Sequence, residues 1–200
     1  MQCLKNFSIS YTLFDMKRIF AIISVMLPLF AAVSCVYDDP EPEFEIKIGE
    51  TIPDFTVTMN DGTTVTGASL RNGVSIIMFF HTSCPDCQNT LPSVQRIYDE
   101  FHEKGVSFAL ISRSQVQNDT KDVYGETVEG VEAFWKRTGY TMPYSAQPDR
   151  KVYNLFATSR VPRVYVCKEG KIMNFYTDDP ILTYEELLAD VESLLYLSPL

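Results

Sequence analysis

The sequence predicts an α/β domain built as a three-layer sandwich, with a central mixed sheet, an N-terminal hairpin and helices on both faces of the sheet. Three observations predict it. Apolar strands at 74–80 and 106–112 flank a segment at 88–104 that has helical spacing, which is the pattern of a βαβ unit with parallel strands. The segments 52–70 and 163–176 each have the pattern of an antiparallel hairpin, so the sheet also contains antiparallel pairs.

The first hairpin and the first core strand are the earliest elements. Residues 52–70 alternate apolar and polar side chains around Asn60-Asp61-Gly62, a sequence typical of a tight turn, and we expect this hairpin at an edge of the sheet. Residues 74–80, VSIIMFF, are apolar without alternation. A run of this kind indicates a central strand that is covered on both faces.

A helix follows the core strand. Five apolar side chains recur at helical spacing between Gln88 and Lys104, Gly105 supplies a stop signal, and Pro92 predicts a kink. The next strand, VSFALIS at 106–112, completes the βαβ unit. The two cysteines of the CPDC sequence therefore lie at the crossover between strand and helix.

The second half of the chain alternates loops with short elements. Residues 113–127 are polar and predict a loop, after which Thr127 can cap a helix that runs to about Arg137. A short helix is expected at 151–157, and the hairpin at 163–176 turns at Glu169-Gly170. Thr183 and Glu186 then form a capping box for a final helix, whose apolar side chains are Leu187, Leu188, Val191, Leu194 and Leu195.

The charge and the motifs of the chain exclude two classes of function. The formal net charge is −9 and the pI is near 4.7, with no later cluster of Lys or Arg, so a nucleic-acid partner is not expected. The chain contains neither a G-x-G-x-x-G sequence nor a P-loop, so a bound nucleotide is not expected either. We expect no cofactor.

The N-terminal residues indicate export. Residues 1–34 have the pattern of a signal peptide, with Lys17 and Arg18 before a fifteen-residue apolar stretch, and Met16 is an alternative start of translation. The sequence AAVSC resembles the lipobox of bacterial lipoproteins, which predicts lipidation of Cys35; cleavage by an ordinary signal peptidase is the alternative. We expect the acidic, Pro-containing segment 35–46 to be a tether and residues 47–200 to be the folded domain.

Cys84 and Cys87 are predicted to be a redox-active pair. Cys84 follows a strand and lies where a helix begins, so the helix dipole and its free N–H groups favour the thiolate, the reactive form. Cys84 would attack a disulfide, and Cys87, one turn further on, would resolve the mixed disulfide. A zinc site needs four ligands, whereas the chain has only two histidines and no second C-x-x-C pair. A structural role is also disfavoured, because closing so small a loop removes little chain entropy.

Residues 47–197 resemble the thioredoxin superfamily, in particular its extracytoplasmic TlpA/ResA-like branch, which overlaps the AhpC/TSA redoxins. The resemblance rests on IGETIPDFTV, FFHTSCPDC, the Leu91-Pro92 pair in the following helix, and VYNLFATSRVPRVYVCKEGKI. It implies a thioredoxin-like fold in which Pro162 follows a cis peptide bond beside the active pair. It also implies that Val161 offers its backbone groups to an extended substrate chain.

The chain departs from that family at several positions. Ser83 stands where Trp is common before the first cysteine, and Thr90 where ResA-like members carry an acid, so the proton acceptor for Cys87 is unidentified. Asp86 is expected to tune the pKa of Cys84 by opposing the thiolate through like-charge repulsion. His81 either offsets Asp86 or is a solvated histidine at the rim of the site. In the strand after Pro162, Cys167 is expected to be a small buried residue, the alternative being a second resolving thiol.

These expectations combine into a membrane-anchored thiol–disulfide oxidoreductase of the bacterial cell envelope, facing the periplasm or on the outer-membrane surface. It would exchange disulfides with exported proteins, mainly as a reductant, and a membrane thiol reductase would supply its electrons. A first alternative is a peroxiredoxin-like peroxidase, although His81 holds the position where that family has Thr. A second alternative is a non-enzymatic binding or copper-handling lipoprotein.

Overall fold

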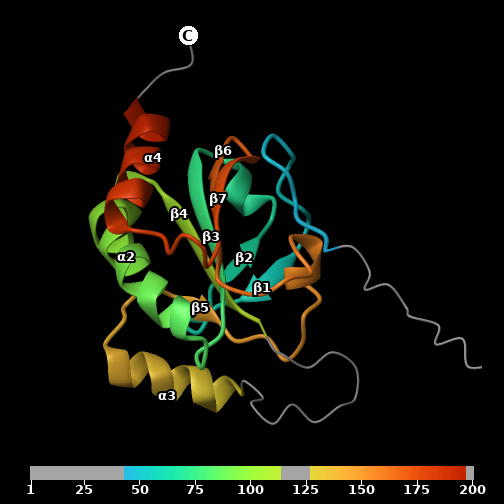
Figure 1. Ribbon diagram of the computed structural model, residues 1–200, viewed down its shortest axis with the longest axis vertical. Coiled ribbons are helices and arrows are strands. Elements are labelled where there is room, and N and C mark those ends of the chain that lie inside the picture. The colour runs from blue at the N-terminus through green and yellow to red at the C-terminus, as the bar shows by residue number, and fades with distance from the viewer. Residues whose placement is uncertain (1–42, 114–126, 197–200) are drawn as a thin grey trace, which may run out of the picture. The chain divides into compact units, whose positions relative to one another are not determined.

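The computed structural model describes residues 43–113 and 127–196, which fold around a central sheet (Figure 1). The predicted signal peptide, the start at Met16 and the lipidated Cys35 lie outside the described residues, as do most of the tether and most of the polar loop before Thr127. No helix in the described part of the chain is long and apolar enough to cross a membrane.

The central sheet has five strands in the order β5-β4-β3-β6-β7. Their bounds are Val74–Phe80 for β3, Ser107–Ser112 for β4, Tyr144–Ser145 for β5, Arg163–Lys168 for β6 and Lys171–Tyr176 for β7. Strand β3 pairs parallel with β4 and antiparallel with β6, so the predicted mixed sheet is confirmed. Strand β5 was not predicted from the sequence, since two residues carry no periodicity.

The N-terminal hairpin is confirmed, with β1 at Thr56–Thr58 antiparallel to β2 at Thr64–Thr66. It borders the β5 edge, as expected, but it forms a two-stranded sheet of its own and does not extend the central sheet. The reason is local: the chain turns at Asn60, whose backbone N–H donates to the Tyr144 carbonyl (2.7 Å) and whose side chain accepts from the Tyr144 N–H (2.8 Å). These two hydrogen bonds at a single residue do not form the repeated pattern that joins two strands of one sheet.

Three α-helices are described. Helix α2 spans Pro85–Phe101 and continues as a 3₁₀ turn at His102–Lys104, so it begins three residues earlier than expected. Helix α3, Val128–Thr138, is capped by Thr127, whose hydroxyl accepts from the Gly130 N–H (3.0 Å). Helix α4 spans Tyr184–Tyr196 behind the predicted capping box, in which the Thr183 N–H donates to Glu186 Oε2 (2.9 Å). Pro92 lies inside α2 as predicted.

Two further 3₁₀ turns complete the elements, η1 at Ser69–Arg71 and η3 at Tyr153–Leu155. The short helix expected at 151–157 is therefore a single 3₁₀ turn. The hairpin of β6 and β7 turns at Glu169 and Gly170, as predicted, and both residues have positive φ (50° and 76°).

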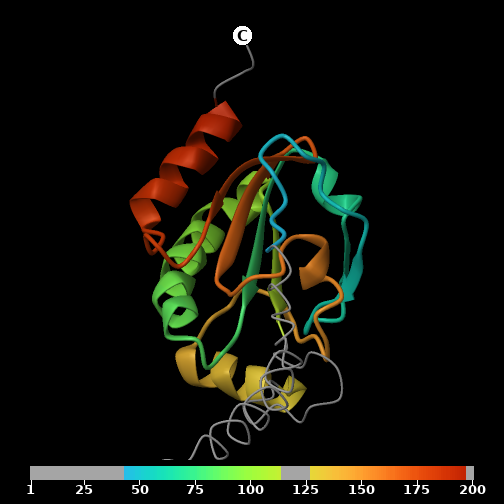
Figure 2. The same ribbon diagram turned by 45° about the vertical axis from the view of Figure 1, so that its right-hand side comes forward.

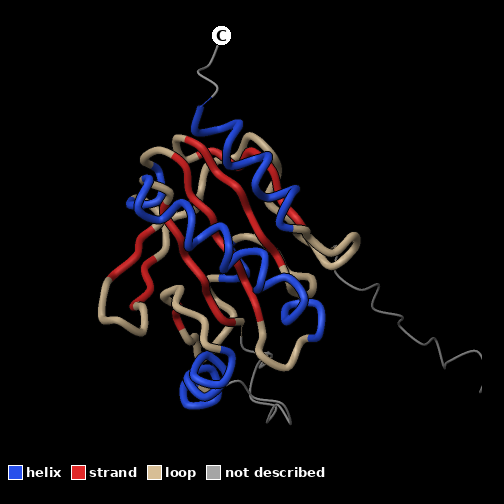
Figure 3. Tube along the Cα trace, turned by 90° about the vertical axis from the view of Figure 1, so that its left-hand side faces the viewer, coloured by secondary structure: helices blue, strands red, loops and turns tan. Residues whose placement is uncertain are grey.

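The two faces of the sheet are covered by different layers. Helices α2 and α4 lie on one side, and the hairpin β1–β2 and η3 lie on the other (Figure 2). Figure 3 faces the helical layer and shows α2 and α4 running side by side over the strands. Phe79 packs on Tyr153 and Phe156, whereas Phe80 packs on Trp135. Since alternate residues of a strand point to opposite faces, both faces of β3 are covered, as the lack of alternation in its sequence predicted.

The chain joins this core inside the segment predicted as a tether. Phe44 exchanges hydrogen bonds with Thr158: its N–H donates to Oγ1 (2.8 Å) and its carbonyl accepts from the Thr158 N–H (3.0 Å). Glu45 forms an antiparallel bridge with Ala157, and Ile46 is buried. Phe44, Glu45 and Ile46 therefore already belong to the folded domain.

Candidate active site

Cys84 is the N-cap residue of helix α2. The chain leaves β3, turns, and enters the helix with Cys84 as N-cap and Pro85 as the first helical residue. Pro is favoured there because its ring presets φ and the missing N–H would have no partner within the helix. The Cys84 Sγ accepts a hydrogen bond from the Cys87 N–H (3.3 Å), in the way that a Ser or Asp caps a helix.

The two thiols differ in exposure. Cys84 is partly exposed, whereas Cys87, one turn into the helix, is completely buried. One sulfur is therefore within reach of a partner molecule, and the other lies behind it.

The pKa of the Cys84 thiol is lowered from 9.0 to about 7. The largest cause is a hydrogen bond from the Cys87 side chain to the Cys84 sulfur, and backbone N–H groups of Cys87 and Asp86 add to it. Burial and the negative charge of Asp86 act in the opposite direction. Asp86 therefore acts against the thiolate, but the hydrogen bonds at the start of the helix outweigh its charge.

Val161 and Pro162 lie beside Cys84, although 77 residues separate Cys84 from Val161 in the sequence. The Cys84 thiol donates to the Val161 carbonyl, with 3.5 Å between sulfur and oxygen. The Val161–Pro162 peptide is cis, as the family resemblance implied. The structure thus brings together the exposed cysteine and the peptide expected to receive a substrate chain.

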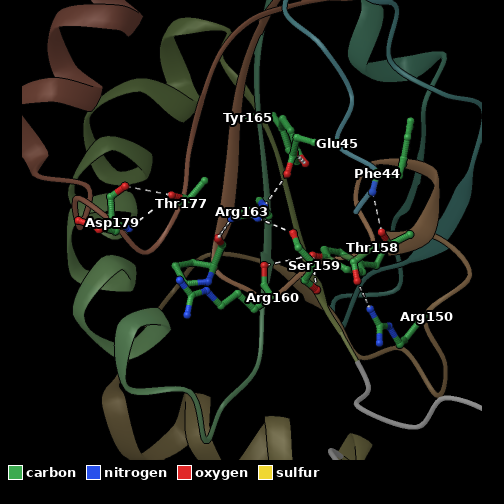
Figure 4. A network of polar contacts seen from close by, with 12 residues as sticks. Phe44, Glu45, Arg150, Thr158, Ser159, Arg160, Arg163, Tyr165, Thr177 and Asp179 are labelled. Atoms are coloured by element: carbon green, nitrogen blue, oxygen red, sulfur yellow. Dashed lines mark hydrogen bonds and ion pairs between the residues drawn. The ribbon is translucent and has the colours of Figure 1, made fainter. Parts of the chain in front are cut away.

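A network of polar contacts holds the loop that carries this peptide (Figure 4). The guanidinium of Arg163 donates to the hydroxyl of Ser159 and forms an ion pair with Glu45, 2.8 Å from Nε to Oε2. The other carboxylate oxygen of Glu45 accepts a hydrogen bond from the Tyr165 hydroxyl. Because both charged side chains are largely buried, the pair ties the loop to the N-terminal segment of the domain.

Tyr153 and Arg150 hold the same loop through hydrogen bonds to its backbone carbonyl groups. The Tyr153 hydroxyl lies 3.0 Å from the Ser159 carbonyl and 3.1 Å from the Arg160 carbonyl, to which it can donate. The Arg150 guanidinium donates to the Thr158 carbonyl (2.9 Å). The backbone leading to Val161 is therefore held at three successive carbonyl groups.

His81 is not the solvated rim residue that was considered for it, because only 1% of its surface is exposed. It directly follows β3, whose residues are all buried, and it continues into the same interior. Its Nδ1 accepts from the Ser83 N–H (3.1 Å) and lies 2.8 Å from the Ser83 hydroxyl. That His81 offsets the charge of Asp86 stays a prediction.

The structure also shows the surroundings of Thr90 and Cys167. Thr90, at the position of the family's acid, is buried and donates its hydroxyl to the Asp86 carbonyl (2.9 Å), so it holds the helix backbone. Cys167 is buried on β6 opposite Ser75, near the start of β3, whereas Cys84 follows the end of that strand. Five residues of strand separate the two levels by roughly 17 Å, which favours the small buried residue over a second resolving thiol.

Sequence reasoning missed Arg113, which also lies at this end of the sheet. It directly follows β4, and its N–H donates to the Phe80 carbonyl (2.7 Å). Burial and the charge of Arg150 lower the pKa of the Arg113 side chain, while Tyr153 and both thiols, Cys87 and Cys84, raise it. The predicted parallel pairing could have found it, since the residues that follow two neighbouring parallel strands emerge at the same edge.

Comparisons with known proteins agree with this geometry. Residues 48–175 match the AhpC/TSA family. Among curated relatives, the thiol-disulfide oxidoreductase ResA of Geobacillus kaustophilus is 23% identical over 181 residues, which cover 89% of this chain and 97% of the relative. ResA of Bacillus subtilis is also 23% identical, over 80% of this chain and 86% of its own.

Solved structures share the fold. A candidate protein disulfide isomerase from Bacteroides thetaiotaomicron has a TM-score of 0.65 at 26% identity, over 75% of this chain and 91% of its own. A thiol:disulfide interchange protein of the thioredoxin family from Chlorobium tepidum has a TM-score of 0.60 at 19% identity, over 75% and 99%. The expected thioredoxin-like fold is confirmed, and the match over residues 48–175 shows that the chain belongs to the AhpC/TSA family.

Proposed function

We propose that the protein is a thiol–disulfide oxidoreductase that works through Cys84 and Cys87. The observation that carries this proposal is the partly exposed Cys84 thiol, with a pKa of about 7, placed at a helix N-terminus with Cys87 buried one turn behind it. The curated relatives named thiol-disulfide oxidoreductase support the same activity.

The reaction proceeds in two exchanges. The Cys84 thiolate attacks one sulfur of a substrate disulfide, so that a mixed disulfide forms and the other substrate sulfur leaves as a thiolate, which takes up a proton. Cys87 then loses its proton and attacks the Cys84 sulfur, which releases the second substrate thiol. Two electrons pass to the substrate, and Cys84 and Cys87 end as a disulfide.

The environment of Cys84 favours the reducing direction. An attacking thiol with a pKa near 7 is typical of thioredoxin, whereas strong oxidants in the superfamily stabilise a thiolate with a pKa of about 3.5. The negative charge of Asp86 contributes to this, because it destabilises the Cys84 thiolate and raises the pKa of Cys84. We therefore propose that the protein reduces its partners.

The proposed partners and location rest on the sequence and on the place of Val161 beside Cys84. An extended chain of an exported, disulfide-bearing protein would pair its backbone with Val161 while its disulfide reaches Cys84. A membrane thiol reductase would return the Cys84–Cys87 disulfide to the dithiol. Lipidation of Cys35 would hold the protein on a membrane of the bacterial envelope, where it meets exported proteins.

Reduction of insulin disulfides tests the proposal. The protein should reduce insulin catalytically with dithiothreitol as electron source, and Cys84→Ser should abolish the activity. Cys87→Ser should instead accumulate a mixed disulfide at Cys84, which mass spectrometry detects. Cys167→Ser is the matched control and should retain full activity, since that thiol lies near the other end of β3. An inactive wild-type protein, or full activity in Cys84→Ser, would refute the proposal.

A peroxidase is the second candidate, because the AhpC/TSA match covers residues 48–175. The position three before Cys84 holds buried His81, and Ser83 contacts its Nδ1, so a Thr hydroxyl is not available there. Peroxide consumption decides between the two: rapid, Cys84-dependent turnover of hydrogen peroxide with slow insulin reduction would replace the oxidoreductase by a peroxidase.

A further inference from the structure

Two arginines share one aromatic ring next to the candidate active site. The guanidinium carbon of Arg113 lies 5.0 Å from the centroid of the Tyr153 ring, and that of Arg150 lies 5.5 Å from the same centroid. The Nε atoms of both arginines are buried and have no hydrogen-bond partner among the described residues. Both guanidinium groups thus lie within 5.5 Å of one aromatic ring, which attracts each of them.

Hydrogen bonds attach both arginines to segments next to the dithiol. The backbone N–H of Arg113 donates to the Phe80 carbonyl at the end of β3, four residues before Cys84. The guanidinium of Arg150 donates to the Thr158 carbonyl, in the loop that carries Val161. One arginine is thus attached next to the strand that precedes Cys84, and the other is attached to the loop that carries Val161. Electrostatic coupling of Arg113 to both thiols agrees with this placement.

The charge of the pair is not balanced by the described part of the chain. Arg71, Arg160 and Arg163 each form an ion pair with a carboxylate, at 2.7 to 2.8 Å. None of the ion pairs among the described residues includes Arg113 or Arg150. Instead each of these two arginines faces the like charge of the other, which lowers the pKa of Arg113 in addition to the effect of burial.

We propose that Arg113 and Arg150 form a carboxylate-binding site that selects disulfide substrates with an Asp or Glu close to the reacting cysteine. This inference rests on the proposed function and names the substrate class of that site. A carboxylate would accept hydrogen bonds from the planar guanidinium groups and would relieve the repulsion between them. A lysine at the same place in a substrate would add a third positive charge, so the site discriminates by repulsion as well as by attraction.

A pair of matched peptide disulfides tests the site. Both peptides carry one intramolecular disulfide; the first has Glu on either side of the reacting cysteine and the second has Lys. The wild-type protein should reduce the Glu peptide about five- to tenfold faster, as kcat/KM, which is the range of a partly shielded charge contact. Arg113→Gln and Arg150→Gln should each bring the ratio to within about twofold, and Arg113→Lys should restore part of it.

The ratio of the two rates separates recognition from chemistry. Loss of a positive charge near Cys84 changes the thiolate fraction, but that change affects both peptides equally and cancels in the ratio. Arg96→Gln is the matched control, since Arg96 lies over the Tyr184 ring at 3.4 Å but about three turns along α2 from Cys84. This control should keep the wild-type ratio. Arg150→Gln keeps the test decisive if Arg113→Gln does not fold.

A binding measurement decides the inference independently of catalysis. The two peptides are made with Ser in place of both cysteines, and the Arg Nε–Hε signals of the full chain are followed by NMR during titration. The Glu peptide should shift the signals of Arg113 and Arg150 and bind at least fivefold more tightly than the Lys peptide. Equal binding of both peptides would overturn the carboxylate site, whether or not insulin is reduced. Selective binding without reduction of either disulfide would overturn the proposed function and leave the site standing.

Discussion

The ion pair between Glu45 and Arg163 lies under the loop that carries Val161, and Glu45→Gln removes one of its two charges. The side chains are 16% and 9% exposed, and 2.8 Å separates Oε2 of Glu45 from Nε of Arg163. The substitution preserves the size of the side chain, so neither a cavity nor a clash complicates the result. Among the described residues it leaves Arg163 charged and buried with neutral partners, the Ser159 hydroxyl and the Pro162 carbonyl.

The size of the loss follows from the burial of the pair. Removing one partner of a buried ion pair costs about 3–5 kcal/mol, because the remaining charge is left uncompensated. Since a Gln at this position can still accept a hydrogen bond, we expect the lower end, about 3 kcal/mol of unfolding free energy. With a urea slope of about 2 kcal/mol per molar, the midpoint should fall by about 1.5 M.

Urea unfolding followed by the fluorescence of Trp135 measures this loss. Trp135 is the only tryptophan of the chain, and it is buried with its indole N–H donating to the Met142 carbonyl (2.9 Å). Asp54→Asn is the control: it breaks the Arg71–Asp54 pair, whose carboxylate is 85% exposed, and should cost less than about 1 kcal/mol. A loss below 1 kcal/mol for Glu45→Gln, at an unchanged slope, would refute the reasoning about the buried pair.

Three further predictions concern the thiols and one glycine. Alkylation of Cys84 by iodoacetamide should rise with pH, reach half its maximum near pH 7, and fall below that pH because protonation removes the thiolate; a midpoint near 9 would contradict the hydrogen bonds described at the helix start. Cys167, whose burial raises its pKa to about 12, should resist alkylation in the native protein and react only on unfolding, which mass spectrometry after a timed reaction will show. Gly67→Ala should lower the free energy of unfolding by about 2 kcal/mol or more, since a Cβ there would lie 2.0 Å from the Pro53 carbonyl oxygen; wild-type stability in urea would contradict this close approach.

The elements that the sequence predicted well are those whose signals are local. The apolar sequence of β3, in which Ser75 is the single polar residue, indicated its bounds correctly because a strand covered on both faces needs no alternating polar positions. The turn at Glu169-Gly170 was also recognisable, since Gly tolerates positive φ at no steric cost. The position of Cys84 at the start of α2 followed from the junction between a strand and a helical pattern.

The features that the sequence did not predict depend on contacts between distant residues. Glu45 lies in an acidic stretch whose composition indicates a solvated tether, and nothing local shows that its partner is Arg163, 118 residues further on. Burial of His81 depends on how the chain leaves β3, which its sequence neighbours do not indicate. Likewise nothing local shows that Arg113 and Arg150 both lie over the Tyr153 ring.

The reduction potential of the Cys84–Cys87 couple is the measurement that tests the central claim most directly. The purified protein is equilibrated with defined ratios of reduced and oxidised glutathione, and the fraction of dithiol is counted by mass spectrometry after alkylation. We predict a single two-electron transition near the potential of thioredoxin, about −270 mV. A potential near −120 mV would contradict the reducing direction, and the absence of any disulfide between these two cysteines would contradict the proposed chemistry itself.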